Sequence, residues 1–114
     1  MTENFKREEF QCPCCGLNNI DQRLVNLLQK AREMFGRPMV VTSGTRCVSH
    51  NQKVGGTPTS DHLLGFAADI DCENSIHRRE LVLAALAVGI PTLGIKKDCI
   101  HLSIGEPARI FTYD

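Results

Sequence analysis

Apolar residues recur every three or four positions between residues 20 and 35 of the chain. Side chains at this spacing share one face of an α-helix, so the pattern predicts a helix over residues 20–35. Asp21 is a candidate N-cap, Gly36 is expected to end the helix, and Pro38 prevents it from resuming. The apolar positions of this helix are Leu24, Leu27, Leu28, Ala31, Met34 and Phe35.

The remaining regular pattern predicts strands and one more helix. Residues 66–72 alternate between apolar and polar, which places Asp69 on the face opposite the bulkier side chains. A second helix is expected over roughly 76–88, capped by Asn74 or Ser75. The other segments with strand character are residues 39–42, 92–96, 99–104 and 108–113.

Residues 43–64 carry Gly, Ser, Thr, Asn and His with little periodicity. They are expected to form a loop of about twenty residues, and loops of this length are usually functional or disordered. Residues 1–15 are expected to form an N-terminal arm, irregular over residues 1–10. This order of elements predicts one α+β domain over residues 1–114, with a small, mainly antiparallel sheet and two helices.

The composition narrows the classes of function. With 42% hydrophobic and 23% charged residues, the chain has the make-up of an ordinary globular domain. Its 13 basic and 13 acidic residues give a formal net charge of zero, whereas nucleic-acid-binding proteins carry a basic surface. We therefore expect no nucleic-acid partner.

Neither a secretory signal nor a membrane span is visible in the sequence. No apolar stretch follows the charged start of the chain, and the longest apolar run, Leu81 to Ile90, is half of what a span needs. We expect a monomer that is made in the cytoplasm and does not insert into a membrane. Without a signal peptide, the six cysteines are expected to be in a reducing compartment, not in a disulfide scaffold.

Three polar residues could form a zinc site with an open position for water. His62 ends the long loop, Asp69 lies on the next strand, and His101 lies within a later strand. Asp69 and His101 both lie opposite the bulky side chains, so neighbouring strands would present them on one polar face. Two histidines and one aspartate can hold zinc and leave a fourth position free. Residue type and pattern alone do not separate this set from His50, His77 and Asp71.

A longer motif supports the zinc interpretation. Ser60-Asp-His-Leu-Leu-Gly-Phe-Ala-Ala-Asp69 fits Ser-x-His-x-x-Gly-x-Ala-x-Asp, flanked by Ser43-Gly-Thr-Arg46 and Asp98-Cys-Ile-His101. In these elements, and in the loop from His50 to Gly56, the chain resembles the zinc D-alanyl-D-alanine carboxypeptidases, an M15-type family with the hedgehog/DD-peptidase fold. That family includes phage endolysins that cut peptidoglycan stem peptides. The resemblance covers roughly residues 10–104 in the right order.

The resemblance implies a role for each matching residue. His62, Asp69 and His101 would be the zinc ligands, and Asp98 would be the general base and acid of the hydrolysis. Residues three apart on a strand point to opposite sides, so Asp98 is expected in the turn just before the strand of His101. Arg46 would hold the substrate's carbonyl oxygen or carboxylate.

Other positions near the motif also bear on the site. Ser60 would give its hydroxyl either to the substrate or to the order of the loop, and Gly65 suits a bend close to the site. Many relatives continue the last element as His-x-Asp, whereas this chain has Ser103 two residues after His101. A serine there can still form a hydrogen bond, but a carboxylate would tune the site more strongly.

The cysteines allow a second metal site. Cys12-x-x-Cys15 and Cys47-Val-Ser-His50 have the paired spacing of a structural zinc site, which would clip the N-terminal arm to the loop beside Arg46. A disulfide from Cys12 or Cys15 to Cys47, or free thiols that are simply buried, would also fit the sequence. These three alternatives stay open at this point.

The function that these features favour is a zinc metallopeptidase that hydrolyses peptidoglycan stem peptides. Both a D-Ala-D-Ala carboxypeptidase and an L-Ala-D-Glu type endopeptidase fit, and a phage lysin of this kind would act at the cell wall. The alternative is a non-catalytic zinc-binding module, either part of a phage structure or a binder of the cell wall. Asp98 and Arg46 favour catalysis, because a pure binder has no need of a base beside the metal.

Overall fold

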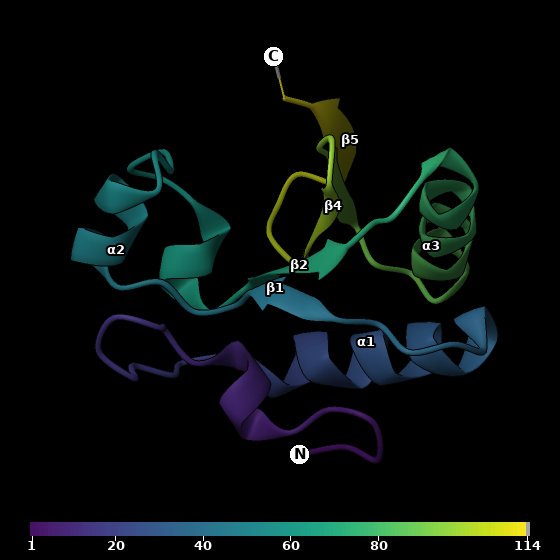
Figure 1. Cartoon of the computed structure of the whole chain (residues 1–114), viewed down its shortest axis with the longest axis horizontal. Coiled ribbons are helices and arrows are strands. Elements are labelled where there is room, and N and C mark those ends of the chain that lie inside the picture. Colours follow the sequence, from purple (N-terminus) through teal and green to yellow (C-terminus); the bar gives the residue numbers. More distant parts are fainter. Residues whose placement is uncertain (114) are drawn as a thin grey trace.

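A five-stranded β-sheet forms the centre of the computed structural model, which describes residues 1–113 (Figure 1). The strands are β1 (Val41–Ser43), β2 (Ala67–Asp71), β3 (Thr92–Ile95), β4 (Cys99–Ser103) and β5 (Arg109–Thr112). They lie in the order β1-β2-β4-β3-β5, and every neighbouring pair is antiparallel except β3 and β5. Together with the helices, this sheet confirms the predicted α+β class and its mainly antiparallel pairing.

Both predicted helices form close to the predicted bounds. α1 spans Gln22–Phe35 and α3 spans Ser75–Ala87. The side chain of Asp21 caps the start of α1, Gly36 ends it with a φ of 76°, and Asn74 caps α3. Within residues 1–113, no helix is long and apolar enough to cross a membrane.

Three short helices lie in segments that were expected to be irregular. α2 (Val48–Lys53) and the 3-10 helix η2 (Asp61–Leu64) interrupt the expected loop, and the 3-10 helix η1 (Arg7–Phe10) interrupts the arm. Such short helices make too few turns for an apolar repeat to be visible in the sequence. The expectation of an unbroken loop and an irregular arm is therefore wrong at these segments.

One face of the sheet packs against α1, α3 and the arm. Phe5 and Phe10 of the arm are buried in this core. Met34 is 62% exposed, contrary to its predicted place on the apolar face of α1. At 100° per residue, Met34 lies to one side of the face that is centred on Leu28. The sheet and helix residues of the core include Leu24, Val25, Leu28, Ala31, Ala68, Ile70, Leu81, Ala85, Leu93, Ile100 and Leu102.

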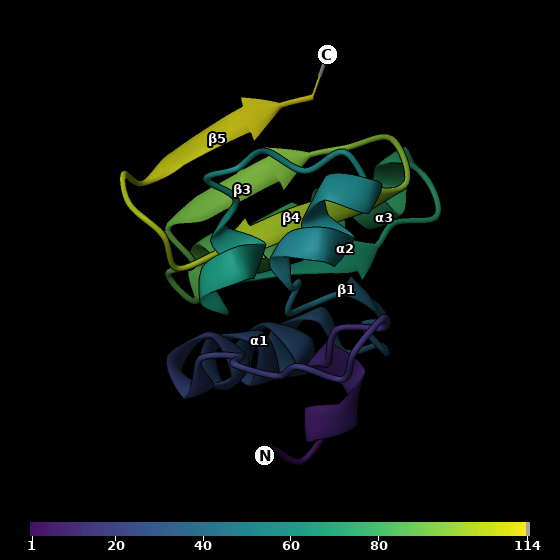
Figure 2. The ribbon, with the colours of Figure 1, turned by 90° about the vertical axis from the view of Figure 1, so that its left-hand side faces the viewer.

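The opposite face of the sheet carries polar side chains and is covered in part by residues 44–64. In Figure 1, α3 lies on one side of the sheet and α2 on the other. Figure 2 shows α2 and η2, in teal, in front of the strands. The segment that the sequence left without regular structure is therefore the layer that lies over the polar face.

Candidate metal centre

Two of the three candidate zinc ligands lie directly opposite each other on neighbouring strands. β2 and β4 pair antiparallel with Asp69 opposite His101. Only 3% of Asp69 and 5% of His101 is exposed. Opposed residues have their Cβ atoms about 5 Å apart, so the strand register by itself brings the carboxylate to the imidazole.

The third candidate ligand, His62, comes to the same place on the short helix η2. The hydroxyl of Ser60 accepts a hydrogen bond from the main-chain N–H of His62 at 3.2 Å, which caps the start of η2. Gly65 ends η2 with a φ of 73°, and a Cβ there would lie 2.0 Å from the main-chain oxygen of Asn19. The expected bend at Gly65 is present, and only glycine fits it.

The donor atoms of the three residues converge on one point. Nε2 of His62 lies 3.2 Å, and Nδ1 of His101 lies 3.1 Å, from the same oxygen, Oδ1 of Asp69. All three donor atoms lie within 4.8 Å of one another. Tetrahedral zinc with bonds of about 2.0 Å places neighbouring ligand atoms about 3.3 Å apart, so the spacing suits a zinc ion.

The hydrogen bonds of His62 also fit a cation at this point. Its Nδ1 lies 2.7 Å from the main-chain oxygen of Gly44, which only accepts, so Nδ1 carries a proton. In a neutral ring, Nε2 then presents a lone pair to the Asp69 carboxylate, and two acceptors that face each other repel. A metal ion that both atoms bind removes this repulsion, and the Gly44 carbonyl fixes the ring orientation.

The carboxyl group of Asp69 is ionised in this setting. Burial by itself raises its pKa, but the hydrogen bonds from His101 and His62 and the charges of these rings together outweigh burial. They hold the pKa of Asp69 well below its usual range. A divalent cation in place of the ring protons would keep the Asp69 carboxylate ionised in the same way, because it too brings positive charge to the carboxylate.

Two basic side chains lie at the other oxygen of Asp69. A guanidinium nitrogen of Arg46 and Nζ of Lys96 each lie 3.5 Å from Oδ2. Arg46 is also held by the hydroxyl of Ser43 at 3.2 Å and by Oδ1 of Asn51 at 3.3 Å. From the sequence alone, Lys96 was not identified as a residue of the site. The one feature that could have indicated it is its position in the turn before the strand of His101.

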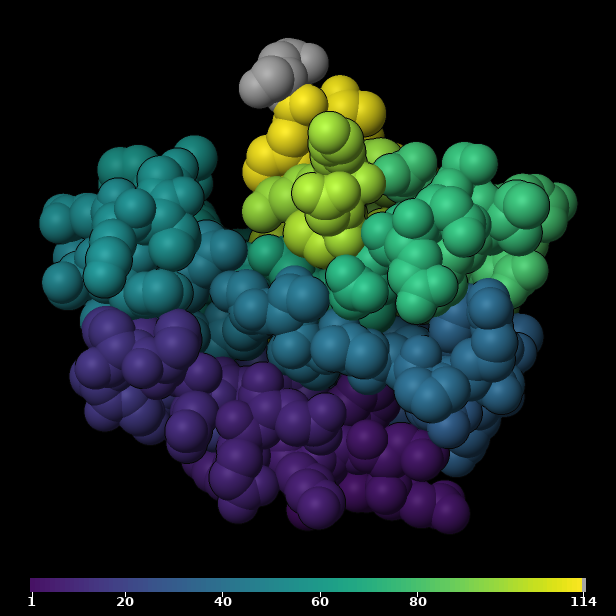
Figure 3. Space-filling view, viewed as in Figure 1, coloured from purple at the N-terminus to yellow at the C-terminus, as the bar shows by residue number. Residues whose placement is uncertain are grey.

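An open cleft of about 430 Å³ leads to these side chains (Figure 3). It lies between the teal segment around α2 and the strands β3 and β5, and its lining includes Arg46, His62 and Lys96. A smaller hollow of about 170 Å³ adjoins it on the side of His101 and Phe111. Three residues line both the cleft and the smaller hollow: Thr57, Ser60 and Tyr113.

The chain matches a protein-family model described as Peptidase M15 over residues 3–103 of its 114 residues. It belongs to the Peptidase M15 family. No curated protein matches the chain. The M15 match confirms the resemblance drawn from the Ser60-to-Asp69 motif, and with the convergent donor atoms it supports a zinc metallopeptidase in general.

Asp98, which the M15 motif implies as the base, lies apart from the three donor residues. It precedes β4 in the turn from β3, where its spacing to His101 places it. Its main-chain oxygen accepts a hydrogen bond from the N–H of Cys72 at 2.8 Å, which holds the turn. Its side chain is exposed, and in the described part of the chain its carboxylate has no hydrogen-bond or ion-pair partner. Asp98 is not among the residues that line the cleft or the smaller hollow beside it.

Ser103, at the position where many M15 relatives carry Asp, is bonded to a carboxylate from another segment. Its hydroxyl donates to Oδ2 of Asp61 at 2.6 Å and accepts from the N–H of Gly105 at 2.8 Å. Asp61 lies in η2 beside His62. Sequence reasoning missed Asp61 because it stands at an unspecified position of the motif, and only the folding of η2 onto β4 brings it here.

The cysteines gather with a different fourth member from the one expected. The sulfurs of Cys12, Cys15 and Cys47 come together, but the fourth ligand atom is the sulfur of Cys14 and not a nitrogen of His50. Cys47 is the N-cap of α2 and its sulfur accepts the main-chain N–H of His50 at 3.4 Å, while the ring nitrogens of His50 are not among the grouped ligand atoms. The prediction of His50 as a ligand is therefore wrong.

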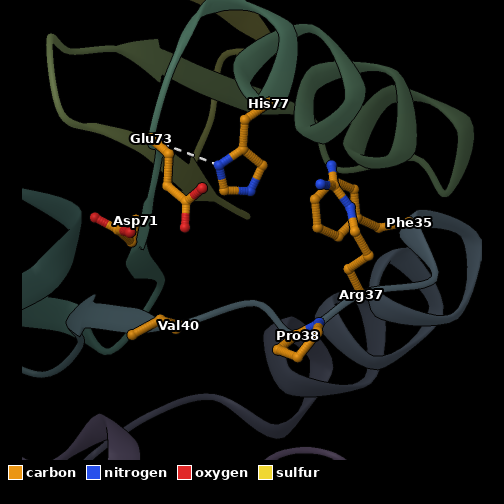
Figure 4. Close-up of a pocket in the computed structure, with 7 residues that line it drawn as sticks. All are labelled: Phe35, Arg37, Pro38, Val40, Asp71, Glu73 and His77. Carbon is orange, nitrogen blue, oxygen red and sulfur yellow. Dashed lines mark hydrogen bonds between the residues drawn. The ribbon is translucent and has the colours of Figure 1, made fainter.

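Another hollow, of about 230 Å³, lies away from the M15 motif residues, between the end of α1 and the start of α3 (Figure 4). The N–H of Glu73 donates to Nδ1 of His77 at 2.9 Å, and the ring of His77 stacks on Phe35 with 5.3 Å between centroids. Asp71 lines the same hollow. His77 and Asp71, which residue pattern alone could not separate from the zinc ligands, are thus apart from the convergent set.

Proposed function

We propose that the chain is a zinc-dependent peptidase that hydrolyses peptide bonds in peptidoglycan stem peptides, with His62, Asp69 and His101 as zinc ligands. The observation that carries the proposal is the convergence of three buried donor atoms beside an open cleft. Membership of the Peptidase M15 family supports the peptidase chemistry. The two basic side chains at the cleft suit a peptide that carries carboxylates.

A zinc ion held by these residues supplies Lewis acidity, which polarises a substrate carbonyl and lowers the pKa of a water molecule. The chain's own residues do the rest. Arg46, fixed by Ser43 and Asn51, stabilises the negative charge that develops on the carbonyl oxygen of the substrate. Asp98 takes the proton of the attacking water and returns it to the leaving amine.

Arg46 and Lys96 also give the cleft its selectivity in this proposal. Both are anchored by Asp69, so their charges lie beside the ligand set and not at the rim. A stem peptide offers either a terminal carboxylate at D-Ala-D-Ala or the carboxylates of D-Glu after L-Ala. Either bond places a negative charge near the scissile carbonyl, where a fixed guanidinium binds it.

The proposal is tested by incubating the protein with purified peptidoglycan and identifying new chain ends by mass spectrometry. We expect new ends with zinc, none with a chelator, and recovery when zinc is added back. Release of D-Ala identifies the carboxypeptidase, and new D-Glu amino ends identify the endopeptidase. His62→Ala serves as the control without a complete ligand set. Absence of new ends with zinc present would contradict the proposal.

A second candidate, a zinc-containing module that binds the cell wall without cutting it, is favoured by one observation. The Asp98 carboxylate is exposed and makes no contact with the three donor residues in the part of the chain that the structure describes. If the protein is such a non-catalytic module, it should sediment with peptidoglycan only when zinc is present, and it should leave the stem peptides intact. The same incubation therefore separates the two functions.

A further inference from the structure

A second group of ligand atoms lies outside the proposed active site. The sulfurs of Cys12, Cys14, Cys15 and Cys47 all lie within 4.8 Å of one another. Three of the separations are 3.6 Å from Cys12 to Cys14, 3.7 Å from Cys12 to Cys47, and 3.2 Å from Cys14 to Cys47. The four sulfurs thus form one compact group.

Tetrahedral zinc is the ion that this spacing fits. Bonds of about 2.3 Å from zinc to sulfur place neighbouring sulfurs about 3.8 Å apart. A disulfide joins only two sulfurs, at about 2.05 Å, and gives no reason for the other two to approach. Burial gives no reason either, because Cys14 and Cys15 are exposed.

Main-chain hydrogen bonds close the segment that carries three of the cysteines into a tight loop. The N–H of Cys12 bonds to the carbonyl of Leu17 at 2.7 Å, and the carbonyl of Cys12 accepts the N–H of Gly16 at 2.8 Å. This tight loop brings three sulfurs of one short segment together. On the other side, the sulfur of Cys47 accepts the N–H of His50, a bond that strengthens when the sulfur is a thiolate.

We propose that Cys12, Cys14, Cys15 and Cys47 bind a structural zinc ion as four thiolates. Each thiol gives up its proton to solvent when the ion binds, so four protons leave for four sulfur–zinc bonds. Four protein ligands leave no position for water or substrate, which makes the site structural and not catalytic. The proposal of this site does not rest on the proposed peptidase function.

The ion would fasten the arm to the segment that carries Arg46. Cys47 is the residue after Arg46. The two segments already touch, since the N–H of Thr45 donates to the carbonyl of Phe10 at 2.7 Å. A Cβ on Gly44 would lie 2.6 Å from that same oxygen. Removal of the ion frees one end of the segment that positions the Arg46 guanidinium.

Metal counting by native mass spectrometry tests the proposal. We expect two zinc ions in the wild type, one in His62→Ala, and one in Cys14→Ser. Cys99→Ser, which changes a cysteine outside the cluster, is the matched control and should keep two. A wild type that retains a single zinc ion, lost in His62→Ala, overturns the proposal. So does a cysteine cluster that holds iron, or a mass that marks a disulfide within it.

A spectroscopic measurement covers the case in which Cys14→Ser does not fold. His62→Ala loaded with Co²⁺ should show the intense near-ultraviolet absorption of thiolate-to-cobalt charge transfer, and a Cys15→Ser change should weaken it. A folded His62→Ala protein without this band contradicts the four-thiolate site. Because neither readout involves hydrolysis, an inactive protein with a loaded cysteine site would refute only the proposed peptidase function.

Discussion

The two oxygens of one carboxylate have different neighbours in this molecule. Oδ1 of Asp69 faces the ring nitrogens of His62 and His101, and Oδ2 faces the charges of Arg46 and Lys96. A single buried residue therefore links the candidate metal ligands to the basic side of the cleft. Changes at the basic residues can alter catalysis while the three donor atoms stay in place.

Lys96→Met should lower kcat/KM on peptidoglycan peptides by about tenfold and leave the zinc content unchanged. The effect is smaller than the 10²–10³ typical of a lost oxyanion donor, because the Lys96 side chain is 28% exposed. Lys97→Met, in the same turn and exposed, is the matched control. Equal losses in the two variants would mean that only the net charge of the turn matters.

Asp98→Asn should lower kcat by about 10²–10⁴ while the protein keeps its zinc, since the amide cannot accept the proton of the attacking water. Zinc content and hydrolysis are measured on the same preparation. Glu106→Gln, which also removes an exposed carboxylate, should retain activity. An Asp98→Asn variant of full activity would remove the role proposed for this residue.

At the scale of elements, the sequence predicts what depends on local pattern and fails where distant segments meet. Alternation alone places Asp69 and His101 on one face, and the strand register sets them opposite each other. Lys96 and Asp61 could not be foreseen, because each reaches the site only when a turn or a short helix folds over the sheet. The sequence also predicts His50 as the fourth ligand of the cysteine group, where the structure has Cys14. This difference could not be predicted either, because it depends on where α2 begins.

The start of α1 gives a stability prediction. The hydrogen bond from the Arg23 side chain, the bond from its main-chain N–H and its charge together outweigh burial, and they lower the pKa of Asp21. A carboxylate with a lowered pKa stabilises the fold fully above its ordinary pKa, and this contribution disappears as the pH falls through the lowered value. Asp21→Ala should therefore cost about 1 kcal/mol at pH 7, and less in acid.

The measurement for this prediction is urea unfolding of the wild type and the variants at neutral pH and at about pH 3. Asp21→Asn keeps an oxygen that caps the helix but has no charge, so at neutral pH it should lose only part of the stability that Asp21→Ala loses. The exposed ion pair with Arg23 adds little by itself. If Asp21→Ala lowered the free energy of unfolding by the same amount at both pH values, the argument from the lowered pKa of Asp21 would be contradicted.

At the scale of the whole molecule, the candidate zinc ligands come from three elements, η2, β2 and β4. A metal ion that binds only the folded chain adds its binding free energy to folding, about 2.7 kcal/mol at a hundredfold excess over Kd. The zinc-dependent rise in Tm should be roughly 10 °C larger for the wild type than for His62→Ala. Thermal unfolding with zinc, with magnesium and with chelator checks this, and equal rises in the two proteins would place the stabilisation elsewhere.

The position of β4 in the sheet has a consequence for motion. β4 is hydrogen-bonded on both sides, to β2 and to β3, whereas His62 lies on a 3-10 turn of the covering segment. Amide hydrogens of β4 should exchange with solvent only on global unfolding, and those of residues 44–64 through local opening. A zinc ion bound by His62, Asp69 and His101 would join the two, so hydrogen exchange in residues 44–64 should slow when zinc binds, with β4 unchanged. A bound metal ion would then control how often residues 44–64 open away from the polar face of the sheet. It would thereby control how often a long polymer can enter the cleft.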